Sequence, residues 1–179
     1  FARFRQTETW AHDASVFWTL KQAHGGKPFW EWPIALRDRE PSALANAERE
    51  HAPAILRTLA TLFLFEHQWA ALHAYATSRG VKIMGDLPIY VDRDSADVWS
   101  DQRLFDLGEG ALPSEVSGVP PDYFSAKGQL WGNPLYRWDV LAQDDFAWWR
   151  RRLRRVLSHT DICRIDHFRA FAAYWAVPF

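Results

Sequence analysis

An arginine and an aspartate stand two residues apart near the carboxyl end of the chain, where the run Asp161 to Ile165 predicts a short buried strand. Because side chains alternate along a strand, Arg164 and Asp166 project to the same face. A permanent guanidinium beside a carboxylate favours the charged carboxylate and lowers its pKa. Such a carboxylate suits nucleophilic attack, and the alternative is an ion pair with a purely structural role.

A second aspartate follows a second apolar run. Val81-Lys82-Ile83-Met84 predicts a buried strand, which places Asp86 at that strand's carboxyl end. The acidic stretch 92–97 has the outline of a calcium loop, but it lacks the ligand at position five, the glycine at six and the glutamate at twelve. We therefore expect a turn and a short helix through Val98-Trp99 there, and no metal site.

Helical patterns surround these strands. One helix is expected to begin with Asp13 as its N-cap and to stop at Gly25-Gly26, and another to run from Pro53 to Ser78 with Gly80 just beyond its end. Ser42 is expected to cap a short helix, and the stretch 30–33 to be extended. A further helix begins at Asp144 or Asp145 and leads into the strand before Asp166. Five arginines on it predict a solvated outer face rather than a nucleic-acid patch, since the net charge is near zero: Arg150, Arg151, Arg152, Arg154 and Arg155.

The order of these elements predicts the fold class. A strand, a helix and a second strand imply parallel pairing, and an aspartate at the end of each strand suggests an α/β fold, a partial (β/α)8 TIM barrel. Residues 92–143 show little periodicity and form a long insertion after the Asp86 strand. A doubly wound sheet is the alternative, but no glycine-rich phosphate loop follows either strand.

Composition limits the partners. The chain has 179 residues, a net charge of −1 and a pI of about 6.7, so nothing favours nucleic acid or a membrane as partner, and no run approaches the ~20 apolar residues of a membrane span. The single cysteine, Cys163, excludes an intrachain disulfide. Eleven tryptophans could fill a core or bind the apolar faces of sugar rings, and most are expected to be core residues.

Four groups of residues, in this order, resemble the 4-α-glucanotransferases, also called amylomaltases or disproportionating enzymes, which form glycoside hydrolase family 77 of the α-amylase clan. They are Gly85-Asp86-Leu87-Pro88-Ile89-Tyr90-Val91 with 94–99, Gly118-Val119-Pro120-Pro121-Asp122-Tyr123-Phe124-Ser125, Gly128 to Tyr136, and Arg164-Ile165-Asp166-His167-Phe168-Arg169. The resemblance covers most of the chain from about Trp18. Ala170 stands where the family usually has glycine.

The resemblance implies a role for each matching residue. Asp166 would be the catalytic nucleophile, Arg164 the arginine that keeps it ionised, and His167 a contact to the sugar nearest the scissile bond. Asp86 would support the site from the third barrel strand. Four more residues would bind substrate, two from a flexible lid over residues 119–131 and two lining the groove: Asp122, Phe124, Trp131 and Asn133.

The function implied is transfer of α-1,4-glucan segments between maltooligosaccharides, or glucans derived from starch or glycogen, by a retaining mechanism in the cytoplasm, without a metal or cofactor. We expect residues 1–179 to be the middle portion of a single catalytic barrel domain that ends just after the nucleophile strand, because a complete barrel takes ~250 residues. The acid/base glutamate would then lie outside the chain, and the C-terminal half of the barrel would be missing. The alternatives are an α-amylase-clan hydrolase and a non-catalytic glucan-binding module.

Overall fold

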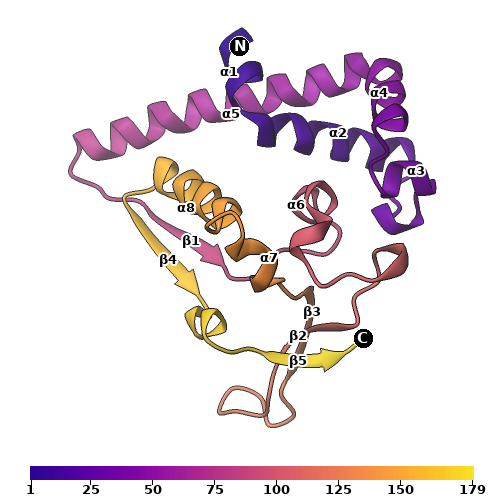
Figure 1. Ribbon diagram of the computed structural model, residues 1–179. Helices are drawn as coiled ribbons and strands as arrows, with labels where there is room; N and C mark the ends of the chain where they lie inside the picture. Colours follow the sequence, from indigo (N-terminus) through magenta and orange to yellow (C-terminus); the bar gives the residue numbers. More distant parts are fainter.

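Helices make up the first part of the chain in the computed structural model, which describes residues 1–179 (Figure 1). They are joined by the 3-10 turn η1 (Phe29–Glu31), and Figure 1 shows them as one layer above the rest of the chain. These helices are α1 (Ala2–Thr7), α2 (Thr9–Ala23), α3 (Ile34–Arg37), α4 (Pro41–Glu50) and α5 (Ala52–Ser78). No helix, α5 included, has both the length and the apolar character of a membrane span.

Helix α5 confirms the predicted run to Ser78, and it ends as a glycine-terminated helix should. Gly80 has φ 73° and donates to the Thr77 carbonyl, while Val81 donates to the Ala76 carbonyl. This pair of bonds is a Schellman motif, in which glycine takes the left-handed position that costs other residues strain. The chain therefore turns sharply from α5 into the first strand.

Three predictions about the helical part are wrong. Asp13 lies inside α2, which begins at Thr9, and its carboxylate accepts a hydrogen bond from Arg39 at 2.8 Å instead of capping the helix. Ser42 is not a cap, because Pro41 already occupies the first helical position of α4 after Glu40. The stretch predicted as extended includes the turn η1, which begins after Pro28.

Two parallel strands follow, β1 (Met84–Pro88) and β4 (Ile162–Asp166), and they pair in register from Met84 opposite Ile162 to Pro88 opposite Asp166. Parallel pairing confirms the prediction. The first strand starts three residues later than predicted, so Asp86 lies at its centre and not at its end. Neither strand is buried as predicted, because one face of the pair is exposed to solvent.

The connection between β1 and β4 is long, as predicted, but it carries short regular elements. Helix α6 (Ala96–Ser100) has Ser95 as its N-cap, and the Ser95 hydroxyl accepts a hydrogen bond from the Val98 amide. A hairpin of β2 (Glu115–Val119) and β3 (Gln129–Pro134) comes next, and β5 (Trp175–Pro178) joins β2 antiparallel to form the sheet β3-β2-β5. The remaining elements are η2 (Gln102–Leu104), η3 (Glu109–Ala111), α7 (Trp138–Ala142), α8 (Ala147–His159) and η4 (Phe168–Phe171).

Aromatic side chains join the helical layer to the insertion. Trp99 of α6 is fully buried, its ring centroid lies 5.9 Å from that of Phe17 in α2, and its indole N–H donates to the Leu36 carbonyl. Tyr136 packs against Trp148 and Trp149 of α8 at centroid distances of 5.6 and 5.4 Å. Four of the eleven tryptophans are buried and four are half-buried, so most pack in the interior as predicted.

Helix α8 begins at Ala147, slightly later than predicted, and the Asp144 carboxylate accepts a hydrogen bond from the Ala147 amide. Its arginines do not form one solvated face. Arg155 is half-buried and pairs with Glu66, and Arg152 lies over the rings of Trp148 and Trp149 and is 3.3 Å from the Ile89 carbonyl. The exposed arginines of the helix are Arg150, Arg151 and Arg154.

Candidate active site

The solvent-exposed face of the β1–β4 pair collects the charged residues. Strand alternation and the register place Asp86 of β1 with Arg164 and Asp166 of β4 on this face, and all three are exposed. The intervening residues, among them Leu87 and Ile165, point to the other face and join the hydrophobic core beside α8. The two candidate carboxylates therefore share one side of a two-stranded platform.

Arg164 binds Asp86 across the two strands. Its Nε lies 2.9 Å from Asp86 Oδ1 and its Nη2 lies 2.6 Å from Oδ2, a bidentate pair. These hydrogen bonds hold the pKa of the Asp86 carboxyl below its usual value. The same hydrogen bonding raises the pKa of Arg164, and the charge of Asp166 adds a smaller effect in the same direction.

The expected direct contact of Arg164 with Asp166 is therefore replaced by a contact with Asp86. The physical reason is register: Asp86 lies directly opposite Arg164, whereas Asp166 lies two residues further along the same strand. Neighbouring side chains across a strand pair lie closer than i and i+2 on one strand. Arg164 still contributes a positive charge beside Asp166 through space.

The chain turns immediately after Asp166. His167 takes a left-handed backbone conformation, φ 52°, before η4 begins. Its ring lies 4.9 Å from that of Trp131 in an edge-to-face arrangement, and the ring of Trp131 lies 6.1 Å from that of Tyr90. The turn thus places a histidine and a 36% exposed tryptophan beside the exposed face, although they are 36 residues apart in the chain.

Tyr90 is a further candidate, to which the sequence alone assigns no role. Its ring is buried, and its hydroxyl is buried without a hydrogen-bond partner. Burial and the neighbouring Tyr174 raise the pKa of Tyr90 to about 12, so the hydroxyl keeps its proton at neutral pH and can donate a hydrogen bond. The only sequence signal was its place four residues after Asp86, within the residues 85–91 that resemble the family.

The loop between β2 and β3 contains two of the predicted substrate-binding residues, Asp122 and Phe124. Asp122 Oδ1 accepts hydrogen bonds from the amides of Phe124 and Ser125, both at 2.9 Å, so this carboxylate shapes its own turn. The side chains of Tyr123 and Phe124 are 96% and 86% exposed. Residues 119 and 129–131 lie in strands, which makes the loop shorter than the predicted 119–131.

Asn133 has a positioning contact. Its Nδ2 donates to the Val91 carbonyl at 3.0 Å, and its backbone amide donates to the Ser117 hydroxyl at 3.2 Å. The first bond ties β3, which carries Trp131, to the segment that follows β1, and the second ties β3 to β2. No group of three histidine, cysteine, aspartate or glutamate side chains is arranged to hold a metal ion.

Comparison with known proteins decides the family. A family model described as 4-alpha-glucanotransferase matches residues 1–179. The chain belongs to the 4-alpha-glucanotransferase family. It is 50% identical to the 4-alpha-glucanotransferase of Thermus thermophilus over 179 residues, which cover 99% of this chain and 36% of that protein. It is 43% identical over 178 residues to the potato (Solanum tuberosum) enzyme named 4-alpha-glucanotransferase, chloroplastic/amyloplastic, covering 99% of this chain and 31% of that protein.

Solved structures agree with this family assignment. The amylomaltase of Streptococcus agalactiae in complex with acarbose superposes with a TM-score of 0.94 at 40% identity, over 99% of this chain and 36% of that one. The amylomaltase of Corynebacterium glutamicum, 22% identical, gives a TM-score of 0.70 over 94% of this chain and 21% of that one, and shows the shared fold. The chain thus spans about a third of the length of these curated relatives.

Proposed function

We propose that the protein is a 4-α-glucanotransferase that moves α-1,4-glucan segments between maltodextrins by a retaining double displacement, with Asp166 as the nucleophile. The observation that carries the proposal is the position of Asp166 as the last residue of β4, exposed and on the same face as the Asp86–Arg164 pair. This arrangement occurs in a chain that a 4-alpha-glucanotransferase family model matches from end to end.

In the first displacement, an oxygen of Asp166 attacks the anomeric carbon of the donor while the glycosidic bond to the departing glucan breaks. The departing oxygen takes a proton from an acid/base carboxyl, and the transferred segment stays on Asp166 as an ester. In the second displacement, the 4-hydroxyl of an acceptor sugar attacks that carbon, gives its proton to the acid/base group and releases Asp166. The two inversions together retain the α configuration.

The acid/base group in this proposal is a glutamate outside residues 1–179. Retaining enzymes hold their two carboxyl groups about 5–5.5 Å apart. Asp86 is a poor candidate for the acid, because Arg164 lowers its pKa and so keeps it charged. We place it in a supporting role: it orients Arg164 on the face of the strand pair that also carries Asp166.

The exposed aromatic residues would contact the sugar and exclude water. Trp131 offers an exposed ring beside His167, and the buried ring of Tyr90 supports Trp131. Transfer in place of hydrolysis requires that water be kept from the ester, and the exposed rings of Tyr123 and Phe124 could cover a bound glucan as a lid. Asp122 would maintain the shape of that loop, and Asn133 the position of β3.

The β1–β4 pair would be two neighbouring strands of a (β/α)8 barrel, its charged face directed to the barrel interior and α8 on the outside. The mixed fold and the match to amylomaltases support this arrangement. A cytoplasmic location is part of the proposal, although the potato relative carries a chloroplastic or amyloplastic designation.

Incubation of the protein, as its gene encodes it, with maltotriose tests the function. Disproportionation converts two maltotrioses into glucose and maltopentaose, so chromatography should show both products while the number of reducing ends stays constant. A rise in reducing ends would indicate a hydrolase instead. Binding of maltooligosaccharides without any product would indicate a glucan-binding module.

A further inference from the structure

The amino-terminal end of the β1–β4 pair is closed by a side chain and not by the backbone alone. The Ile83 carbonyl accepts from the amides of Asp161 and Ile162 at 2.9 and 3.3 Å. The Ile83 amide donates in return to Asp161 Oδ2 at 2.8 Å. The carboxylate of Asp161 therefore supplies the first rung of the parallel ladder.

Helix α5 also contacts the carboxylate of Asp161. His73 Nε2 lies 3.0 Å from Asp161 Oδ2, and the two side chains are only 23% and 26% exposed. The Ile83 hydrogen bond first, then His73, and more weakly the nearby charge of Lys82, lower the pKa of the Asp161 carboxyl. Asp161 therefore stays charged at neutral pH and joins α5, β1 and β4 at one point.

The contacts of Asp161 control the register of β4 against β1. A shift of β4 by two residues would keep Cys163 and Ile165 facing the core, so the pleat alone does not forbid it. The same shift would move Asp166 by about 6.6 Å along β1, at ~3.3 Å per residue. It would also take Arg164 away from Asp86. The nucleophile is thus placed by contacts that pin the register.

We propose that Asp161 and His73 are positioning residues that fix the register of β4 and thereby place Asp166 for attack. The role rests on the proposed function, since it concerns the nucleophile of that reaction. Asp161 lies five residues before Asp166, about 16 Å along an extended strand, so neither residue touches the sugar.

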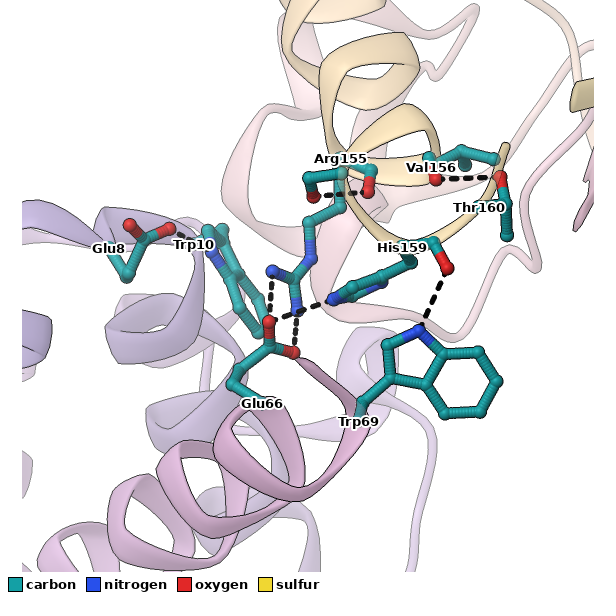
Figure 2. Close-up of polar contacts among 9 residues, drawn as sticks. Glu8, Trp10, Glu66, Trp69, Arg155, Val156, His159 and Thr160 are labelled. Carbon is teal, nitrogen blue, oxygen red and sulfur yellow. Dashed lines mark hydrogen bonds and ion pairs between the residues drawn. The ribbon is translucent and has the colours of Figure 1, made fainter. Parts of the chain in front are cut away.

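A second cluster between the same helix and the same strand–helix unit provides a matched control (Figure 2). Glu66 of α5 binds Arg155 through both oxygens, one contact being 2.7 Å, and its Oε2 lies 2.8 Å from His159 Nε2. Burial acts to raise the pKa of Glu66, but the hydrogen bonds from Arg155 and His159 outweigh it and the net shift is downward. This cluster joins α5 to α8 and makes no hydrogen bond to β1 or β4.

The test uses a maltosyl fluoride with a second fluorine on the reacting ring, which slows both displacements. Fluoride leaves without help from an acid, so the rate of the first step depends on the placement of Asp166. An oxygen of Asp166 forms the bond to the anomeric carbon as the C–F bond breaks. The experiment uses the protein as its gene encodes it. Mass spectrometry of the peptide that contains Asp166 detects the ester, and fluoride release gives the rate at which the ester forms.

Three variants should separate positioning from stability. In Asp161→Ala we expect labelling to slow by at least about 10²-fold, because a misplacement of about 1 Å already causes that loss and a register shift moves Asp166 further. Asp161→Asn keeps an oxygen for the Ile83 amide and should recover part of the rate. Glu66→Ala removes the contact between α5 and α8 and should be labelled at the wild-type rate. This should hold even if the variant's midpoint of unfolding falls as far as that of Asp161→Ala.

Labelling of folded Asp161→Ala at the wild-type rate would overturn the proposal, and so would equal slowing in Glu66→Ala. Should Asp161→Ala be unfolded at the assay temperature, His73→Ala removes one of the two bonds and must label more slowly than Glu66→Ala; an equal rate overturns the role. Wild-type protein that is not labelled at Asp166 overturns the proposed function itself, and the positioning role with it.

Discussion

At the scale of single residues, the main finding concerns which carboxylate Arg164 binds. The guanidinium bridges both oxygens of Asp86 across the strand pair, and Asp166 receives only its through-space charge. Asp166 is thus left without a hydrogen-bonded partner that would have to be displaced before attack. An exposed, charged carboxylate of this kind is a better nucleophile than one held in a bidentate ion pair.

The Asp86–Arg164 pair predicts a pH-dependent contribution to stability. The pKa of Asp86 is lowered in the folded protein, so the pair stabilises the fold above the usual aspartate pKa of about 3.9 and loses this effect as pH falls through the folded value. Asp86→Asn should therefore be less stable than wild type at pH 7, with the difference shrinking toward pH 3. Urea unfolding at both pH values measures it, and a difference that is constant or grows in acid would contradict the pairing.

Spacing along the chain predicted that Arg164 and Asp166 share a face, and the structure agrees because strand alternation is a local property. It did not predict Asp86 as the partner, since register across two strands is set by contacts 78 residues apart. Tyr90 escaped assignment for a similar reason: its buried, unpartnered hydroxyl results from packing against Trp131 and Tyr136.

At the scale of elements, the long helix α5 followed from its apolar pattern and its terminal glycine, both of which are local signals. The hairpin β2–β3 did not, because its strands are short and β2 is stabilised by pairing with β5, which lies more than 50 residues after β2. The boundaries of β1 and β4 also shifted, since partner strands decide which residues pair. Short strands therefore depend on tertiary contacts more than α5 does.

Gly85 of β1 is a position where the packing of two elements can be tested. A Cβ built there would lie 2.7 Å from Thr160 Cγ2, at the end of α8, and 3.0 Å from Thr160 Oγ1. Gly85→Ala should therefore cost about 1–3 kcal/mol of unfolding free energy through overpacking, although glycine-to-alanine changes without a clash stabilise by ~0.4–1 kcal/mol.

Urea unfolding of two further variants controls for this effect. Gly108→Ala should cost less, because Gly108 has an ordinary φ of −89° and its nearest contact to an added Cβ is 3.4 Å. Thr160→Ser removes the clashing methyl but keeps the hydroxyl that donates to the Val156 carbonyl, so it should restore stability to Gly85→Ala. An unchanged stability of Gly85→Ala alone would show that Thr160 does not pack as closely against Gly85 as the structure indicates.

At the scale of the whole molecule, three parts meet around one exposed face. Helix α5 of the helical layer binds α8, and α8 packs on the strand pair (Figure 1). The insertion brings Trp131 beside His167. Parallel pairing and a long insertion were both predicted from the order of the elements, and both are confirmed. Closure of a barrel around the charged face stays a prediction, as does the lid formed by the loop between β2 and β3.

The central claim is that Asp166 performs a covalent step, and Asp166→Asn tests it most directly in the protein as its gene encodes it. The amide has nearly the same shape, and Arg164 keeps its bidentate partner Asp86, so the fold and the binding of a long maltooligosaccharide should persist. Disproportionation of maltotriose, followed by chromatography, should fall by several orders of magnitude, because an amide is a far poorer nucleophile. Transfer at a near-normal rate would remove Asp166 from the mechanism, and joint loss of binding and transfer would show that its role is structural.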